Sequence, residues 1–128
     1  MCTKLKERYQ KAPFISSNHF GKAKIIIDID GNSYSGRFPN LLRQGSVVLK
    51  VADYEDLGTM LARPWIDYVP VKMDLSDLEE KIEWVRDNDV EARRIAESGR
   101  ERMKGLFTLE SIKCYTAHLL TAYSKLLM

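Results

Sequence analysis

The chain has little cysteine or histidine and no long apolar run. Of its 128 residues, two are cysteine and two are histidine, and Cys2 and Cys114 lack the spacing of a metal site or a disulfide scaffold. No apolar stretch approaches the roughly 20 residues that cross a bilayer, and the charged N-terminus lacks the apolar core of a signal peptide. These absences argue against a zinc module, a disulfide-rich domain and a membrane-spanning segment, and two isolated cysteines favour a reducing compartment.

The chain also lacks an excess of either charge. Its 20 Lys and Arg against 18 Asp and Glu give a net charge of +2, too small to argue for nucleic acid or an anionic membrane as partner. The hydrophobic fraction of 45% and the charged fraction of 30% are ordinary for a globular protein with one core. We interpret residues 1–17 as a polar lead-in, with a candidate helix over residues 3–11, and residues 18–128 as a single domain.

Residues 22–51 are predicted to form a strand, a loop, a short helix and a second strand. Consecutive β-branched residues within 24–30 predict a strand covered on both faces, as in a parallel sheet. Glycine and serine are frequent in residues 31–36, where glycine permits positive φ and close backbone approach. Pro39 fits the first turn of a helix that ends at Gly45, and residues 46–51 form the next strand.

This arrangement points to an anion site. A loop between a strand and a helix start brings backbone N–H groups and a partial positive charge to one point. Arg37 adds a planar cation that can hold phosphate oxygens bidentately. The loop is neither G-x-G-x-x-G nor a P-loop. A nucleotide phosphate is the ligand that this geometry favours, with an ordinary strand–turn–helix as the alternative.

The second half of the chain is predicted to contain one more strand and then three helices. The strand, residues 63–71, lies between two prolines, with Trp65 expected in the core. From residue 74 the apolar period becomes 3.6, and a capping box at residues 76–79 begins the first helix. Asn88 and Asp89 begin the second helix and Thr108 caps the third. The apolar stripes expected to be buried are Leu78, Ile82 and Val85; Ala92, Ile95, Ala96, Met103 and Leu106; and Ile112, Tyr115, Leu119, Tyr123 and Leu126. The charges opposite the second stripe predict a solvated face.

Three sequence runs resemble a known family. D-I-D-G-N-S-Y-S-G-R-F, L-L-R-Q-G-S-V-V-L-K and R-P-W-I-D-Y-V-P-V resemble glycosyltransferase family 90, which contains the Rumi-type protein O-glucosyltransferases and the fungal capsule-associated proteins. The resemblance covers roughly residues 13–127. It implies an α/β fold: part of the Rossmann-like donor domain of a GT-B glycosyltransferase, with about three mostly parallel strands followed by three C-terminal helices.

The resemblance also implies an activity and a site. The activity is transfer of a sugar from a UDP-sugar donor to an acceptor hydroxyl, on a protein serine or a glycan. Ser35 and Arg37 match the loop motif that contacts the donor diphosphate, and Gly31 and Gly36 give the backbone access. Weaker candidates for donor binding, each with a structural alternative, are Asp30, Ser46 and Lys50. Glu55 or Asp56 would accept hydrogen bonds from the ribose, and the register does not decide between them.

Neither a metal nor another cofactor is expected. Asp28 and Asp30 form a D-x-D pair whose carboxylates share one side of a strand, as a divalent cation would need. The competing interpretation is that Asp30 caps the turn and Asp28 is paired or solvated. The GT-B resemblance implies instead that basic groups such as Arg37 take the place of the metal. Asp67 stands where the family usually has a histidine, so the role of that histidine is not transferred.

The resemblance further implies that the catalytic base and the acceptor site belong to a preceding domain. We therefore expect an incomplete donor-binding domain that is inactive alone, with no catalytic residue assigned in this chain. The family points to the lumen of the endoplasmic reticulum or Golgi, whereas no signal peptide is visible, so a cytoplasmic location stays open. The alternative function is a non-catalytic binding module, or a degenerate paralogue, that docks on a full-length relative.

Overall fold

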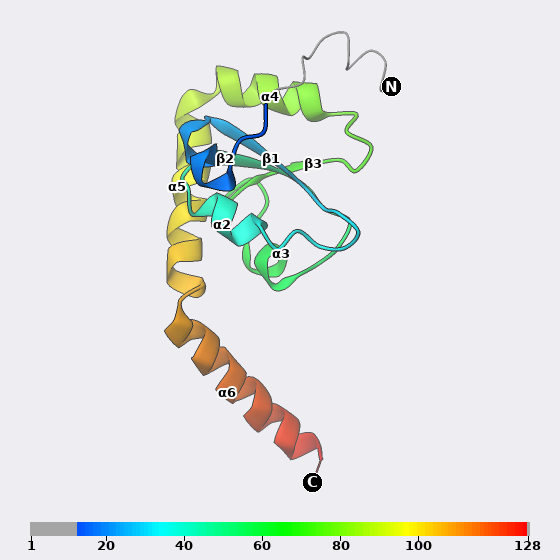
Figure 1. The fold of residues 1–128 in the computed structure, drawn as a ribbon, viewed down its shortest axis with the longest axis vertical. Coiled ribbons are helices and arrows are strands. Elements are labelled where there is room, and N and C mark those ends of the chain that lie inside the picture. Colours follow the sequence, from blue (N-terminus) through cyan, green and yellow to red (C-terminus); the bar gives the residue numbers. More distant parts are fainter. Residues whose placement is uncertain (1–12, 128) are drawn as a thin grey trace.

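The computed structural model of the protein describes residues 13–127, so most of the polar lead-in and its candidate helix lie outside the described residues. Figure 1 shows a small sheet with helices on both sides and a last helix that extends away from it. The elements are η1 (Ser17–Lys22), β1 (Ile25–Ile29), α2 (Phe38–Leu42), β2 (Val47–Val51), α3 (Leu57–Leu61), β3 (Val69–Val71), α4 (Leu78–Asp87), α5 (Asp89–Leu106) and α6 (Leu109–Leu126). The predicted α/β class, with parallel strands followed by three helices, is confirmed.

The sheet has the order β1-β2-β3, with both pairs parallel. One face packs against α4 and α5, and its buried residues are Val47, Leu49, Val51, Val69, Val71, Val85, Ala92, Ile95 and Ala96. The other face packs against α2, and its buried residues are Ile26, Phe38, Leu41, Leu42, Val48, Ala62 and Met103. The central strand β2 is therefore buried along its whole length.

β1 departs from the expectation of cover on both faces. Ile26 and Asp28 are buried, but Ile27 and Ile29 are 43% and 44% exposed. β1 is an edge strand of the sheet, and within residues 13–127 no helix covers this part of its second face. The isoleucine run is apolar enough to be buried on both faces of the strand. In the described chain, other residues pack fully on only one of these faces.

The third strand is shorter than predicted. Only Val69–Val71 pairs with β2, and Pro64 and Tyr68 form an isolated bridge before it. Trp65 has a φ of 63°, and its ring packs edge to face on Trp84 at 5.1 Å between centroids. It is 40% exposed, so its placement in the core was wrong.

Three helix starts test the predicted caps. The capping box at residues 76–79 was wrong: α4 begins after Asp77, whose side chain caps no helical amide and accepts instead from the Lys72 N–H at 3.0 Å. Asn88 precedes α5, but its side-chain amide donates to the Trp84 carbonyl at 2.9 Å and therefore closes α4. Thr108 caps α6 as predicted, accepting from the Ser111 N–H at 3.1 Å.

The predicted helix faces hold for α5 and fail for α6. Arg93 and Arg94 of α5 are exposed and pair with Asp89 and Glu91, which confirms a solvated face. Leu106, predicted to be buried, is 36% exposed, so its place in the buried stripe was wrong. α6 has no buried residue among its 18, and Leu119 is 52% exposed, so the burial of its stripe was wrong. No helix in the described part of the chain is long and apolar enough to span a membrane.

Candidate functional site

Two buried carboxylates and one buried ammonium meet where β1 and β2 end. The parallel register sets Asp28 beside Lys50, and Lys50 Nζ lies 2.9 Å from Asp28 Oδ2 while also contacting Asp30 Oδ1. The side chains of Lys50 and Asp28 are 2% and 1% exposed. Because an unpaired buried charge is costly, this ammonium serves as the partner of both carboxylates, and the second positive charge comes from Arg37.

Asp28 also holds the Gly/Ser loop against β1. Its Oδ1 accepts from the Ser35 hydroxyl at 2.7 Å and from Arg37 Nη2 at 3.2 Å. Arg37 Nη2 donates in addition to the Ile29 carbonyl at 3.1 Å. The Arg37 side chain is nevertheless 60% exposed, and its Nε and Nη1 make no hydrogen bond to any described residue. The guanidinium is held in place by one nitrogen and keeps donors for a ligand.

Asp30 joins the loop after β1 to the loop after β2. Its carboxylate accepts from the backbone N–H of Ser35 at 3.0 Å, of Asp53 at 3.1 Å and of Tyr54 at 3.2 Å. Burial alone would raise the pKa of Asp30, but the hydrogen bonds from Lys50 and from these amides outweigh it and hold the pKa below its ordinary value of 3.8. Asp30 is therefore an ionised anchor for both loops.

The loop leaves backbone donors beside Arg37. Within the described residues, the Gly36 and Arg37 amides donate to no acceptor, whereas the Ser35 amide is taken by Asp30. α2 has five residues, so its dipole adds less positive charge than the sequence suggested.

The loop glycines do not use the positive φ that they permit. Gly45, which ends α2, is the described glycine with positive φ, at 81°. A Cβ on Gly31 would meet nothing within 4 Å, and one on Gly36 would lie 3.9 Å from the Tyr34 ring. Neither the backbone nor the packing of the described chain demands glycine at these two positions, which leaves open space on the outer side of the loop.

Two hollows lie beside the segments that follow β1 and β2, and the second of them includes Tyr34 and Gly36 of the Gly/Ser loop. One of about 340 Å³ is lined by Ala52, Asp53, Tyr54, Glu55, Thr59, Met60 and Tyr68, and one of about 530 Å³ by Tyr34, Gly36, Pro39, Glu55, Asp56, Leu57, Gly58 and Phe107. Glu55 borders both hollows and is exposed. Asp56 instead caps α3, accepting from the Thr59 N–H at 2.8 Å. Of the two acidic candidates, Glu55 is the one whose carboxylate is not engaged by the described residues.

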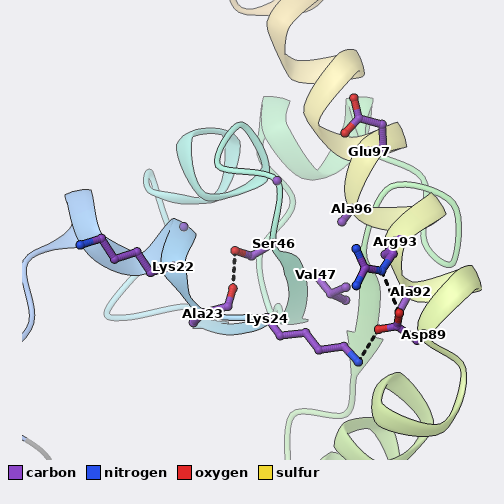
Figure 2. A pocket seen from close by; sticks show the side chains of 12 residues that line it. Lys22, Ala23, Lys24, Ser46, Val47, Asp89, Ala92, Arg93, Ala96 and Glu97 are labelled. Carbon is purple, nitrogen blue, oxygen red and sulfur yellow. Dashed lines mark hydrogen bonds and ion pairs between the residues drawn. The ribbon is translucent and has the colours of Figure 1, made fainter.

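Ser46 lies at the other end of β2. Its hydroxyl donates to the Ala23 carbonyl at 2.7 Å, beside a hollow of about 530 Å³ that Figure 2 shows from close by. There Asp89 pairs with Lys24 at 2.6 Å and with Arg93 at 2.8 Å. The two cations of this hollow that Figure 2 joins by dashed lines thus share one carboxylate of the chain. The structure gathers Asp30, Ser35, Gly36, Arg37 and Lys50 at one end of the sheet, flanked by Gly31 and Glu55, and leaves Ser46 out.

The sequence left Asp28 open between a metal ligand and a paired or solvated carboxylate, and its position at the centre of the ion pairs was not predicted. The signal was available, because Asp28 and Lys50 occupy matching positions on two adjacent predicted strands. Both D-x-D carboxylates contact Lys50. Within residues 13–127, no group of three or more His, Cys, Asp or Glu is arranged to hold a metal ion. The expectation that no metal is used stays a prediction.

Asp67 is the other buried carboxylate that the sequence did not explain. It accepts from the Arg63 N–H at 2.8 Å and from the Ser98 hydroxyl at 2.6 Å, and Arg102 Nε lies 2.8 Å from it. Burial would raise the pKa of Asp67, but the hydrogen bonds from Arg63 and Ser98 and the charge of Arg102 hold it below 3.8. Asp67 fixes the segment before β3 to α5, away from the Gly/Ser loop.

Comparison with known proteins agrees with the resemblance seen in the sequence. The profile of glycosyl transferase family 90 matches residues 2–128. The chain is 38% identical over 117 residues to Protein O-glucosyltransferase 3 of Rattus norvegicus, covering 90% of this chain and 23% of that protein. It is 39% identical over 114 residues to Protein O-glucosyltransferase 2 of Danio rerio, covering 88% and 23%, and 36% identical over 107 residues to Protein O-glucosyltransferase 1 of Homo sapiens, covering 83% and 27%. The chain thus spans about a quarter of the length of these relatives. By the match to its profile over nearly the whole sequence, the chain belongs to glycosyl transferase family 90.

Proposed function

We propose that this chain binds the diphosphate of a UDP-sugar and so contributes the donor site for transfer of the sugar to an acceptor hydroxyl. The observation that carries the proposal is the exposed guanidinium of Arg37, oriented by Asp28 beside the unpaired amides of Gly36 and Arg37. It stands at the carboxyl end of a parallel sheet, where α/β proteins bind their ligands. Membership of family 90 and relatives named protein O-glucosyltransferases support the reaction class.

The free donors of Arg37 suit a phosphate group. Nε and Nη1 lie on different edges of the planar guanidinium, so they offer two separate N–H donors to phosphate oxygens beside the fixed positive charge. The local charges of Asp28, Asp30, Lys50 and Arg37 already balance, so a diphosphate would add net negative charge. We therefore expect weak binding, with a dissociation constant on the order of millimolar. Gly36 would let the phosphate approach the loop backbone, and Ser35 and Asp30 would hold that loop in place.

The two hollows beside the segments that follow β1 and β2 would take the remainder of the nucleotide. Glu55 borders both, and its free carboxylate would accept hydrogen bonds from the ribose hydroxyls. We propose that no metal takes part, because Lys50 stands between the carboxylates of Asp28 and Asp30. Arg37 would then supply the cationic charge that the diphosphate needs.

The same arginine would assist the reaction. When the bond between sugar and phosphate breaks, negative charge grows on the diphosphate, and a fixed cation stabilises that charge. The acceptor, a protein serine or a glycan hydroxyl, must lose a proton to a base. We assign that base and the acceptor site to the portion of the relatives that this chain does not match, and we place the reaction in the lumen of the endoplasmic reticulum or Golgi.

A titration of UDP into isotope-labelled protein, followed by NMR, tests the donor site. The amides of residues 32–38 should shift on addition of UDP. Arg37→Ala should remove about 1.5–3 kcal/mol of binding free energy, the range for hydrogen bonds to charged groups, and make millimolar binding undetectable. Arg37→Lys should restore binding only in part.

Arg93→Ala is the matched control, because Arg93 is an exposed arginine in the hollow at the opposite end of the sheet. It should leave the shifts at residues 32–38 unchanged. Shifts confined to residues 22–24 and 89–97, or equal shifts in wild type and Arg37→Ala, would contradict the donor site.

A further inference from the structure

Tyr68 has a fixed ring and a free hydroxyl. The ring packs edge to face on Phe38 with 5.3 Å between centroids, and it lies against the buried cluster on the α2 side of the sheet. The Tyr68 carbonyl accepts from the Trp65 N–H at 2.7 Å, and Val69 is fully buried in β3. The hydroxyl makes no hydrogen bond to a described residue and is not sealed from solvent. Ring and backbone thus hold in place a hydroxyl that can contact a ligand.

Tyr68 lies between the core and the hollow that follows β2. That hollow of about 340 Å³, which we call the Tyr68 hollow, is lined by Ala52, Asp53, Tyr54, Glu55, Thr59, Met60 and Tyr68. The Phe38 ring also lies 5.2 Å from Lys50 Nζ, so one ring connects Tyr68 to the ion pairs beneath the Gly/Ser loop. Burial raises the pKa of Tyr68 above its ordinary value of 10.0, against the charge of Lys50. The hydroxyl is therefore protonated at neutral pH and can donate as well as accept.

The charge of the Tyr68 hollow excludes phosphate. Asp53 and Glu55 contribute carboxylates that make no ion pair or hydrogen bond with a described residue, and no Lys or Arg is among the described residues that line the hollow. Because like charges repel, the phosphates belong outside, at Arg37, and an uncharged part of the donor belongs inside. Carboxylate oxygens accept from hydroxyls, and the Tyr68 hydroxyl does both. This set of groups suits the hydroxyls of a sugar ring.

The neighbouring hollow, which includes Gly36, suits the base better. Its apolar and aromatic lining side chains are Tyr34, Pro39, Leu57 and Phe107. Such side chains bury the flat, aromatic parts of ligands. Glu55 borders both hollows, so a nucleotide sugar bound at Arg37 can place its base in one hollow and a sugar ring in the other.

We propose that Tyr68 is a specificity-determining residue of the donor site, whose hydroxyl hydrogen-bonds a sugar-ring hydroxyl of the bound nucleotide sugar. That ring is either the ribose or the transferred sugar, because both offer the same chemistry. The inference rests on the proposed function, since it takes the diphosphate to be at Arg37. It adds that the Tyr68 hollow binds a sugar ring and that the hollow beside Gly36 binds the base.

Three probes that share a diphosphate test this assignment by NMR of isotope-labelled protein. Inorganic pyrophosphate should shift the amides of residues 32–38 alone. UDP should shift in addition Leu57, Gly58 and Phe107 through its base, and also residues 52–55, 59, 60 and 68 if its ribose fills the Tyr68 hollow. If the transferred sugar fills that hollow, only UDP-glucose should shift this last group of amides.

Tyr68→Phe removes only the hydroxyl. It should weaken binding of the probe that fills the Tyr68 hollow about 2- to 12-fold, the factor for the net contribution of one hydrogen bond between neutral groups. It should leave pyrophosphate binding and the midpoint of urea denaturation unchanged, because the hydroxyl has no partner in the described chain. Tyr123→Phe is the matched control, because Tyr123 is 58% exposed on α6 and lines neither hollow. It should leave all three affinities unchanged.

The outcomes separate this inference from the proposed function. If no probe shifts residues 32–38, the proposed diphosphate site is wrong and this inference falls with it. If all three probes shift residues 32–38 but none shifts the amides of the Tyr68 hollow, the inference alone is wrong. Equal affinities of the wild type and Tyr68→Phe for both sugar-bearing probes overturn it as well. So does UDP that shifts the Tyr68 hollow without shifting Leu57, Gly58 and Phe107, because the base would then occupy the Tyr68 hollow.

Discussion

Lys50 is the residue on which the charges beneath the proposed donor site depend. Replacing it by methionine keeps the volume of the side chain but leaves Asp28 and Asp30 close together without their shared cation. Breaking a buried ion pair in this way costs about 3–5 kcal/mol, so Lys50→Met should lower the free energy of unfolding by that amount in urea denaturation.

Lys24, which directly precedes β1, is the matched control for Lys50→Met. Its ammonium pairs with Asp89 at 2.6 Å, but the side chains are 46% and 45% exposed, and exposed ion pairs contribute about 0–1 kcal/mol. Lys24→Met should therefore change the free energy of unfolding by less than about 1 kcal/mol. Equal losses in the two variants would show that the charges around Lys50 are not buried as described.

For the residues around Lys50, the sequence predicted their proximity better than it predicted their roles. The sequence predicted the order strand, loop and strand correctly. It therefore predicted that four residues of this region come together: Asp30, Ser35, Arg37 and Lys50. The sequence proposes Lys50 as a ligand of the sugar donor. In the structure its side chain is buried and its ammonium pairs with Asp28 and Asp30. Ser46 lies four residues before Lys50, directly ahead of β2, and at about 3.3 Å per residue that distance places it at the other end of the sheet.

At the scale of elements, α5 approaches the segment before β3 at a glycine. A Cβ on Gly99 would collide with the Asp67 carbonyl oxygen and stand 3.0 Å from Leu42 Cδ2. Because the first of these atoms belongs to backbone, it cannot move aside as a side chain could. Gly99→Ala should therefore destabilise the protein by about 1–3 kcal/mol or more, measured from the denaturation midpoint.

Gly105 provides the comparison within the same helix. A Cβ there would meet nothing within 4 Å, and alanine is favoured over glycine in a helix by about 1 kcal/mol. Gly105→Ala should leave stability unchanged or raise it. A gain in both variants would mean that α5 does not lie against the Asp67 segment.

Periodicity predicts that a face is apolar, and it carries no information about what covers that face. The stripes of α4 and α5 are covered by the sheet, so Val85 and Ile95 are buried. The stripe of α6 is equally regular, yet no described element packs along it. The same limit explains β1, whose Ile27 and Ile29 continue an apolar run but lie at the open edge of the sheet. In both cases the described residues supply no element that packs on the apolar face.

Across the whole molecule, carboxylates join segments that are far apart in the sequence. Asp30 connects the end of β1 to the loop after β2, Asp67 connects the segment before β3 to α5, and Asp89 connects the start of α5 to Lys24. Hydrogen bonds from Lys24 and Arg93 lower the pKa of Asp89 to about 2. The sheet and its helices are thus held together partly by groups that function only when ionised.

These lowered pKa values fix how stability depends on pH. Asp30 and Asp67 ionise below the ordinary value of 3.8, so between their folded pKa values and 3.8 the unfolded chain binds more protons than the folded one. Their contribution is fully present above pH 3.8 and is lost as the pH falls through the folded pKa values. We expect the free energy of unfolding to be level with respect to these groups from pH 7 to about pH 5 and then to fall towards pH 3. Each such carboxyl adds up to about 1.4 kcal/mol per pH unit to the slope.

Asp67→Asn should be less stable at pH 7, because it removes a buried partner of Arg63 and Arg102, and should show a shallower slope below pH 4. Urea denaturation at several pH values measures both quantities, and a slope that Asp67→Asn leaves unchanged would contradict a lowered pKa at this carboxyl.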